Sequence, residues 1–189
     1  MSTELKEQII ELTHPEVERG LCGLVIGTVC SGRTTLLKLM HLVWKELGES
    51  IFIPEGHDFR LGALALAKSP SRPFLVTLDH VEKKDLLKAV VLAPGVSFWA
   101  SLVLSRVSVL RKTPAIVEEV LVDETFQKFD VVLLTRTNKD HQVEVTVIKN
   151  RSAVKNFTVD PREVYSSWQD AAKDLKSPVL FTKVATQNA

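Results

Sequence analysis

The chain has 189 residues, which suits a single domain with at most a small appendage. Hydrophobic residues make up 45% and charged residues 25%, so a core can form and a low-complexity or broadly disordered chain is excluded. The formal net charge of +1 excludes a global electrostatic attraction to nucleic acid or to an acidic membrane. Two cysteines are too few for a disulfide scaffold, and the first residues lack the apolar core of a signal peptide, so we expect a cytoplasmic protein, or one peripheral at the inner face of a membrane.

Strands and helices are predicted to alternate along most of the sequence. In chain order the apolar patterns predict a helix over 3–13, a strand over 21–26, a helix over 33–47, a strand over 51–53, a helix over 61–67, a strand over 74–78, a helix over 82–92, a strand over 96–104, a helix over 114–122, strands over 129–135 and 143–148, a helix over 161–175 and a strand over 179–184.

Two of these patterns indicate how the sheet is built. The run 21–26 is apolar throughout and lies between Gly20 and Gly27, which is typical of a strand buried on both faces of a parallel sheet. The strands over 129–135 and 143–148 are separated by turn residues and predict an antiparallel hairpin at the sheet edge. The fold class expected is α/β, a mainly parallel sheet covered by helices, with a C-terminal β-hairpin. We expect residues 1–20 to form an N-terminal helical arm and residues 21–189 a single domain.

A short motif between the first strand and the second helix predicts a phosphate-binding site. The sequence Gly27-Thr28-Val29-Cys30-Ser31-Gly32-Arg33-Thr34 matches the pattern G-x-x-x-x-G-K-[ST], except that arginine stands at the lysine position. A strand before the loop and a helix after it would direct backbone N–H groups and the helix N-terminus at one anion. The predicted nucleotide-binding residues are Gly27, Cys30, Ser31, Gly32, Arg33, Thr34 and Thr35. The alternative is a glycine-containing turn that binds no ligand.

Each polar residue of the motif has an expected role. The Thr34 hydroxyl would bind the Mg²⁺ of the nucleotide, Thr35 would lie on the α-phosphate side, and Arg33 would contact the β- and γ-phosphates. Guanidinium is a wide planar fork, whereas the lysine ammonium is a compact charge that can follow a transferring phosphoryl group. We therefore expect binding to survive the substitution and hydrolysis to slow.

Carboxylates follow two of the predicted strands. Asp79 ends the apolar strand 74–78, and Glu55 follows the strand 51–53, so either could orient the attacking water of a hydrolase. Asp79 is also placed to cap the helix that begins near Glu82, and Glu55, with its neighbours His57 and Asp58, could belong to a solvated polar loop.

Other candidate chemistries lack a supporting pattern. The five histidines show no zinc-ligand spacing, and Cys30 has no identifiable base nearby in sequence. Trp44, Trp99 and Trp168 are dispersed, which is more typical of core residues than of a stacking platform for nucleic acid. We therefore predict no direct nucleic-acid partner.

The order of these features resembles the C-terminal motor domain of the type II and type IV secretion ATPases, which also serve pilus and archaellum assembly. Residues 27–35 running into LLKLM are similar to that family's GSGKTTLL stretch, and residues 51–55 to its acidic box. Arg72-Pro73 followed by 74–79 is similar to its RP-x-x-I-x-x-G-E strand, with Asp79 in place of the glutamate. Residues 129–132 and the hairpin to Ile148 resemble its late D-V-V-V segment.

This resemblance spans roughly residues 20–150 and implies a P-loop, RecA-like domain that uses ATP and Mg²⁺. It also implies self-association into a homo-oligomer or pairing with a related ATPase subunit, and a membrane-platform protein as partner. The chain departs from the family at Arg33, at Asp79 and at residues 94–100, which lack the family's histidine. About 20 residues precede the first strand, which we expect to leave no room for the family's N-terminal domain.

We therefore expect a reduced relative that binds ATP with Mg²⁺, hydrolyses it slowly or not at all, and couples it to an assembly machine. A non-catalytic interaction or regulatory module that keeps the fold without the nucleotide is the alternative. A small-molecule kinase would fit the size, but the sequence lacks a recognisable lid.

Overall fold

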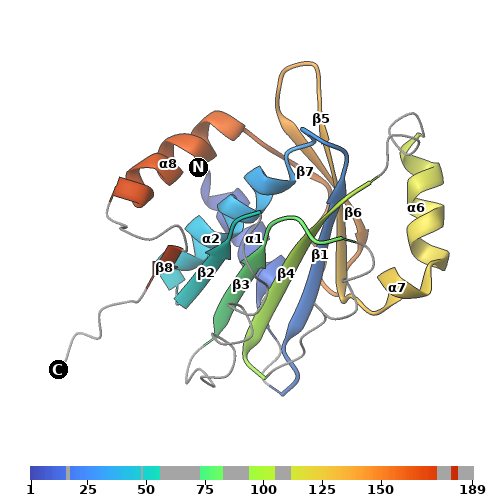
Figure 1. Cartoon of the computed structure of the whole chain (residues 1–189), viewed down its shortest axis with the longest axis horizontal. Helices are drawn as coiled ribbons and strands as arrows, with labels where there is room; N and C mark the ends of the chain where they lie inside the picture. Colours follow the sequence, from blue (N-terminus) through green and yellow to red (C-terminus); the bar gives the residue numbers. More distant parts are fainter. Residues whose placement is uncertain are drawn as a thin grey trace.

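The computed structural model describes residues 1–15, 18–47, 49–55, 73–82, 94–104, 112–173 and 180–182. Within them the chain forms one eight-stranded sheet in the order β7-β6-β5-β1-β4-β3-β2-β8 (Figure 1). The five central strands are parallel to one another: β5 (Val131–Thr137), β1 (Leu21–Gly27), β4 (Val96–Val103), β3 (Phe74–Leu78) and β2 (Glu49–Ile53). The edge strands are antiparallel to their neighbours: β6 (Val143–Lys149), β7 (Phe157–Val159) and β8 (Leu180–Thr182).

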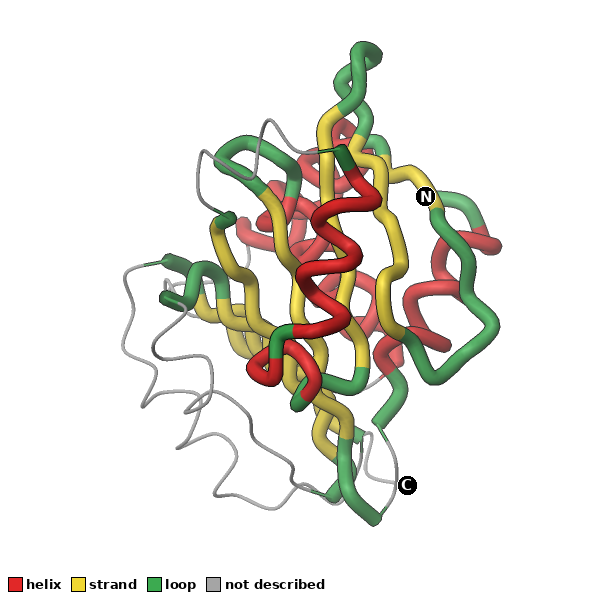
Figure 2. Tube along the Cα trace, turned by 90° about the vertical axis from the view of Figure 1, so that its right-hand side faces the viewer, coloured by secondary structure: helices red, strands yellow, loops and turns green. Residues whose placement is uncertain are grey.

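Helices cover both faces of this sheet. On one face lie α1 (Thr3–Thr13), α2 (Arg33–Leu47) and α8 (Pro161–Lys173), and on the other lie α6 (Thr113–Val122) and the short α7 (Glu124–Gln127) (Figures 1 and 2). Each face has its own cluster of buried apolar side chains. The α/β class predicted from the sequence is therefore confirmed. Among the described helices, none has the length and apolar character needed to cross a membrane.

The central strand β1 is buried along its whole length, as its apolar run predicts. Leu21 and Val25 contribute to the core under α1, α2 and α8, whereas Leu24 and Ile26 contribute to the core under α6 and α7. Between them Gly23 faces the indole of Trp99 on β4, and a Cβ at Gly23 would lie 2.4 Å from that ring. The glycine thus lets a tryptophan lie flat against the middle of the sheet.

The N-terminal helix α1 is packed on α2. Ile9 and Leu12 are buried, and the Thr13 hydroxyl accepts a hydrogen bond from Trp44 Nε1 at 2.7 Å while donating to the Ile9 carbonyl oxygen at 2.6 Å. The helix begins at the cap Ser2, whose hydroxyl accepts from the Leu5 N–H, and ends at His14 before Pro15. Residues 3–13 are therefore joined to the core by buried side chains.

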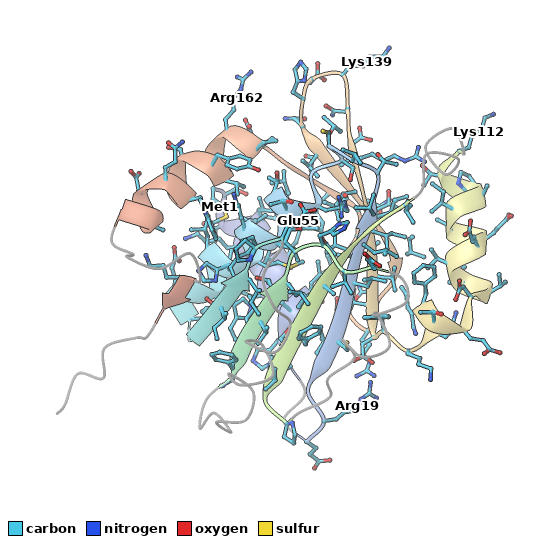
Figure 3. All side chains as sticks on the ribbon, viewed as in Figure 1. Met1, Arg19, Glu55, Lys112, Lys139 and Arg162 are labelled. Carbon is cyan, nitrogen blue, oxygen red and sulfur yellow. The ribbon has the colours of Figure 1, made fainter. Side chains whose placement is uncertain are left out.

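Asp130 fixes the amino ends of β1 and β5, opposite the ends that carry the predicted loop. Its carboxylate accepts a hydrogen bond from the Cys22 N–H at 2.9 Å and pairs with the guanidinium groups of Arg19 and Arg151. Its own N–H donates to the Cys22 carbonyl oxygen at 2.7 Å. Figure 3 shows Arg19 at this end of the molecule. A nearly buried carboxylate with two guanidinium partners thus sets the register of the two strands.

Most predicted elements are confirmed with small shifts of their ends, including the hairpin, now β5 and β6. The helix predicted over 61–67 lies outside the described residues, as does nearly all of the one over 82–92. The sequence patterns did not predict α7 or β7. They predicted a last strand over 179–184, and β8, the described part of that strand, pairs antiparallel with β2.

Gly23→Ala should destabilise the fold, because its Cβ would overlap the Trp99 indole. Overpacking of a core costs about 1–3 kcal/mol. Urea denaturation of Gly23→Ala, Trp99→Leu and the double variant tests this, since the smaller leucine should relieve part of the clash and make the two effects non-additive. Strict additivity would contradict the contact.

His41 on α2 should make the fold sensitive to acid. Its ring is buried against Phe52 and Trp168, with centroids at 6.4 and 5.4 Å, and its Nδ1 has no hydrogen-bond partner among the described residues. Burial, and secondarily the charge of Lys45, lowers the pKa of His41 from 6.5 to about 4. The folded state keeps His41 neutral where the unfolded state protonates it, so stability should fall as the pH drops from about 6.5 to about 4.

The full loss for this one proton is about 3 kcal/mol. We expect His41→Phe to reduce the fall in unfolding free energy over this pH range. Urea denaturation at pH 7, 5.5 and 4.5 provides the measurement. An equally steep fall in His41→Phe and the wild type would show that other groups govern the acid response.

Candidate functional site

The loop of residues 28–32 joins the carboxyl end of β1 to the first turn of α2. Gly32 has φ +89°, and a Cβ there would lie 2.2 Å from Val143 Cγ2 on β6. A Cβ at Gly27 would lie 2.2 Å from the Ser31 hydroxyl oxygen, and Cys30 adopts the left-handed conformation with φ 60°. Both glycines of the motif are therefore required by close contacts, and at Gly32 by the backbone angle as well.

Backbone N–H groups at the start of α2 are available to a ligand. The Ser31 N–H donates to the Thr28 carbonyl oxygen at 3.3 Å, and the Leu36 N–H donates to that of Gly32 at 3.0 Å. Between them, the N–H groups of residues 32–35 have no acceptor within the part of the chain that the structure describes. Unsatisfied N–H groups at a helix N-terminus, together with the helix dipole, favour an anion.

Hydrogen bonds to β5 and to residues after β4 hold the loop. The hydroxyls of Ser31 and Thr135 lie 2.9 Å apart, and the Thr137 hydroxyl donates to the Cys30 carbonyl oxygen at 2.8 Å. The Leu104 N–H, just past β4, donates to the Gly27 carbonyl oxygen at 2.8 Å. The loop conformation is thus set by the two strands that flank β1.

Asp79 reaches the loop from the end of β3, two strands away. Its Oδ2 accepts a hydrogen bond from the Thr34 hydroxyl at 2.7 Å, and its Oδ1 accepts one from the Ser101 hydroxyl at 2.8 Å. The Ser101 oxygen in turn accepts from the His80 N–H at 2.8 Å, and His80 has φ 62°. A buried carboxylate therefore links the first turn of α2 to the ends of β3 and β4.

Arg33, at the lysine position of the motif, extends along the loop toward β4. Its Nη1 lies 3.4 Å from the Ser101 hydroxyl oxygen and its Nε 3.4 Å from the Thr28 carbonyl oxygen. Burial lowers the pKa of Arg33, while the negative charges of Asp79 and Glu55 raise it. Guanidinium stays protonated in proteins, so this half-buried group keeps its positive charge at the edge of the loop.

Glu55 is the less constrained of the two predicted carboxylates. It follows β2, its side chain is 69% exposed, and its Oε1 lies 3.9 Å from His80 Nε2 (Figure 3). Its negative charge acts on Arg33. His57 and Asp58 lie outside the described residues, so their predicted proximity stays a prediction.

A pocket of about 250 Å³ opens in front of the loop. Its lining residues come from three parts of the chain. The loop and the start of α2 contribute Cys30, Ser31, Gly32, Arg33, Thr34 and Thr35, the β5–β6 hairpin contributes Thr137, His141 and Val143, and the start of α8 contributes Pro161 and Tyr165. Six of the seven predicted nucleotide-binding residues line this pocket, and Gly27 lies behind Ser31 at the end of β1.

Several residues at the site were not selected from the sequence. Ser101, Thr135 and Thr137 are hydroxyl residues at the carboxyl ends of apolar strands, a signal that could have been used. Lys38 lies one helical turn beyond Thr34, and burial lowers the pKa of its ammonium while Asp79 raises it. Tyr165 and His141 reach the pocket through the tertiary fold, which the local pattern does not encode.

No protein-family model and no curated protein matches this sequence.

Gly32→Ala should destabilise the fold by about 2 kcal/mol, because alanine is strained at positive φ and its Cβ would overlap Val143. In a Val143→Ala background the clash is removed and the backbone strain remains, so the cost of Gly32→Ala should be smaller. Unfolding free energies of the four proteins in this cycle provide the measurement. An equal cost in both backgrounds would contradict the predicted clash.

Proposed function

We propose that the protein binds ATP with Mg²⁺ on the loop of residues 27–35 and hydrolyses it slowly or not at all. The observation that carries this proposal is the 2.7 Å hydrogen bond between the Thr34 hydroxyl and the Asp79 carboxylate at the edge of the loop pocket. It joins two oxygen ligands from residues 45 positions apart in the chain.

The geometry of these two oxygens fits magnesium. Mg²⁺ binds oxygen ligands octahedrally at 2.0–2.1 Å, so two adjacent ligands are about 2.9 Å apart. The hydroxyl and carboxylate oxygens need to separate by only a few tenths of an ångström to reach that spacing. Mg²⁺ also typically uses one or two carboxylates and completes its shell with phosphate oxygens and water. A bound Mg²⁺ would neutralise phosphate charge.

The loop next to this pair fits the phosphates. Residues 32–35, which include Arg33, all line the 250 Å³ pocket. Oriented N–H groups at a helix N-terminus bind phosphate without sequence-specific side chains. A triphosphate lying along the loop would place its terminal group near Arg33 and Asp79 and its first phosphate near Thr35.

Slow hydrolysis follows from the surroundings of the two candidate bases. Both carboxylate oxygens of Asp79 already accept hydrogen bonds from hydroxyl groups, Thr34 and Ser101. The Glu55 side chain is mostly exposed to solvent, and Glu55 is not among the described residues that line the pocket. Arg33 contacts Ser101 and Thr28 with a planar fork, which follows a moving phosphoryl group less readily than a lysine.

The wider part of the proposal rests on the sequence resemblance to the secretion ATPases. It comprises a RecA-like P-loop fold, self-association or pairing with a related ATPase subunit, and coupling to an assembly machine with a membrane-platform protein at the inner face of a membrane. The parallel sheet with a loop and helix after β1 supports it at the level of architecture.

A non-catalytic interaction or regulatory module is the second candidate, and one observation favours it. The Arg33 guanidinium already has protein partners in the Ser101 hydroxyl and the Thr28 carbonyl oxygen, and it lies in the field of Asp79 and Glu55. An arginine that is compensated by the protein itself can be retained without nucleotide.

Thermal unfolding with and without millimolar ATP and MgCl₂ tests the proposal. Ligand at 100 times its dissociation constant stabilises by about 2.7 kcal/mol, which raises Tm by about 5–10 °C for a chain of this size. We expect EDTA to remove most of this increase. Thr34→Val and Asp79→Asn should lose the magnesium-dependent part, and Arg33→Ala should lose most of the shift.

Lys112→Ala, which removes one positive charge at the N-cap of α6, is the matched control and should keep the full shift (Figure 3). If saturating ATP and MgCl₂ leave the wild-type Tm unchanged, nucleotide binding is refuted and the non-catalytic module is favoured. Release of phosphate faster than about one per second would contradict slow hydrolysis.

A further inference from the structure

The residues that line the pocket differ in chemistry. Arg33 and Thr34 line one part of it, and the Thr34 hydroxyl donates a hydrogen bond to Asp79, which lies next to the lining residues. The other lining residues are Thr137, His141 and Val143 of the hairpin and Pro161 and Tyr165 of α8, and the Lys38 ammonium lies against the Tyr165 ring. Strand order places β5 and β6 on the other side of β1 from β4 and β3, so the hairpin approaches the loop from the side away from Asp79. α8 reaches the pocket across α2, where its Tyr165 lies against Lys38.

Tyr165 gives the pocket a fixed aromatic surface. Tyr165 is 38% exposed, although it is one of the larger residues of the chain. The Lys38 ammonium of α2 lies 4.6 Å from the centre of this ring and 4.9 Å from that of Trp168, one turn further along α8. The cation–π contacts hold Tyr165 in place against α2 while leaving part of the ring open to the pocket.

His141 reaches the same pocket from the tip of the β5–β6 hairpin. The Asn138 side-chain oxygen accepts the N–H groups of Asp140 at 3.0 Å and of Gln142 at 2.9 Å, and the Asn138 carbonyl oxygen accepts that of His141 at 3.1 Å. This network keeps His141 in the left-handed conformation with φ 61°. With the hairpin tip held in this way, His141 is one of the residues that line the pocket.

We infer that Tyr165 and His141 form a base subsite, in which the aromatic base of the bound nucleoside triphosphate stacks on the Tyr165 ring. The inference rests on the proposed function and adds which part of the pocket receives the nucleoside. With the phosphates at Arg33, Thr34 and Asp79, the rest of the ligand would extend past Thr35 toward Tyr165 and His141, which line the same pocket. Stacking of a base on an aromatic side chain contributes about 1–3 kcal/mol and needs no particular base.

Calorimetric titration of Mg·ATP and of Mg·tripolyphosphate tests the subsite, because tripolyphosphate presents the phosphate chain without a base. We expect Tyr165→Ala to weaken ATP about tenfold and tripolyphosphate less than twofold. Tyr165→Phe should keep the wild-type affinity for both. His141→Gly, which suits the positive φ, should weaken ATP and spare tripolyphosphate. Gln169→Ala, on the same helix, is the control and should change neither.

The outcomes separate this inference from the proposed function. If wild-type protein binds both ligands and Tyr165→Ala lowers both affinities equally or neither, the base subsite is refuted while the phosphate site stands. If the wild type binds neither ligand, the nucleotide site and the base subsite are refuted together. Thermal unfolding of each variant without ligand shows whether the variant is folded. If Tyr165→Ala does not fold, the separate variants Tyr165→Phe and His141→Gly test the base subsite in its place.

Discussion

The burial of β1 on both faces and both edges is the constraint on which the site depends. Hydrogen bonding to β4 and β5 aligns Gly27 with Val103 and Thr135, so the carboxyl ends of three parallel strands meet at the start of the loop. Asp130 fixes the register from the opposite end. Because the apolar side chains of β1 are fully buried, the core itself determines where the loop begins and where the hydroxyls of Ser101 and Thr135 approach it.

The sequence predicts the parts of this arrangement that local patterns encode. The apolar run 21–26, the helical spacing of 33–47 and the turn residues of the hairpin each specify an element directly, and Asp79 is found because it ends an apolar strand. Tyr165 could not be found in this way, because α8 returns to α2 from more than 120 residues away. His141 could not be found either, because only the folded hairpin brings it to the pocket. The strand at 179–184 was visible as a pattern, but its pairing with β2 depends on which sheet edge is available.

The loop, the hairpin and α8 are mechanically linked around the pocket. Ser31 bonds Thr135, Thr137 bonds the Cys30 carbonyl oxygen, and Gly32 lies directly against Val143. On the other side, Lys38 connects α2 to the rings of α8. A ligand that fills the pocket therefore contacts three elements that are distant in sequence and already touch one another, so it needs to order little of the protein on binding.

The balance of charge at the loop makes magnesium central to any nucleotide binding. Asp79 is 6% exposed and negative, and it lies beside the position that a terminal phosphate would take, so a bare triphosphate meets a repulsive carboxylate that the low local dielectric strengthens. The single charge of Arg33 already compensates Asp79 and Glu55, so Arg33 cannot also neutralise the phosphate charge. A divalent cation between the Thr34 hydroxyl and Asp79 reverses the sign of that interaction, since the carboxylate then attracts the metal that the phosphates also bind. Arginine at position 33 can then remain near Ser101 while the nucleotide is held, which favours retention of the ligand over its turnover.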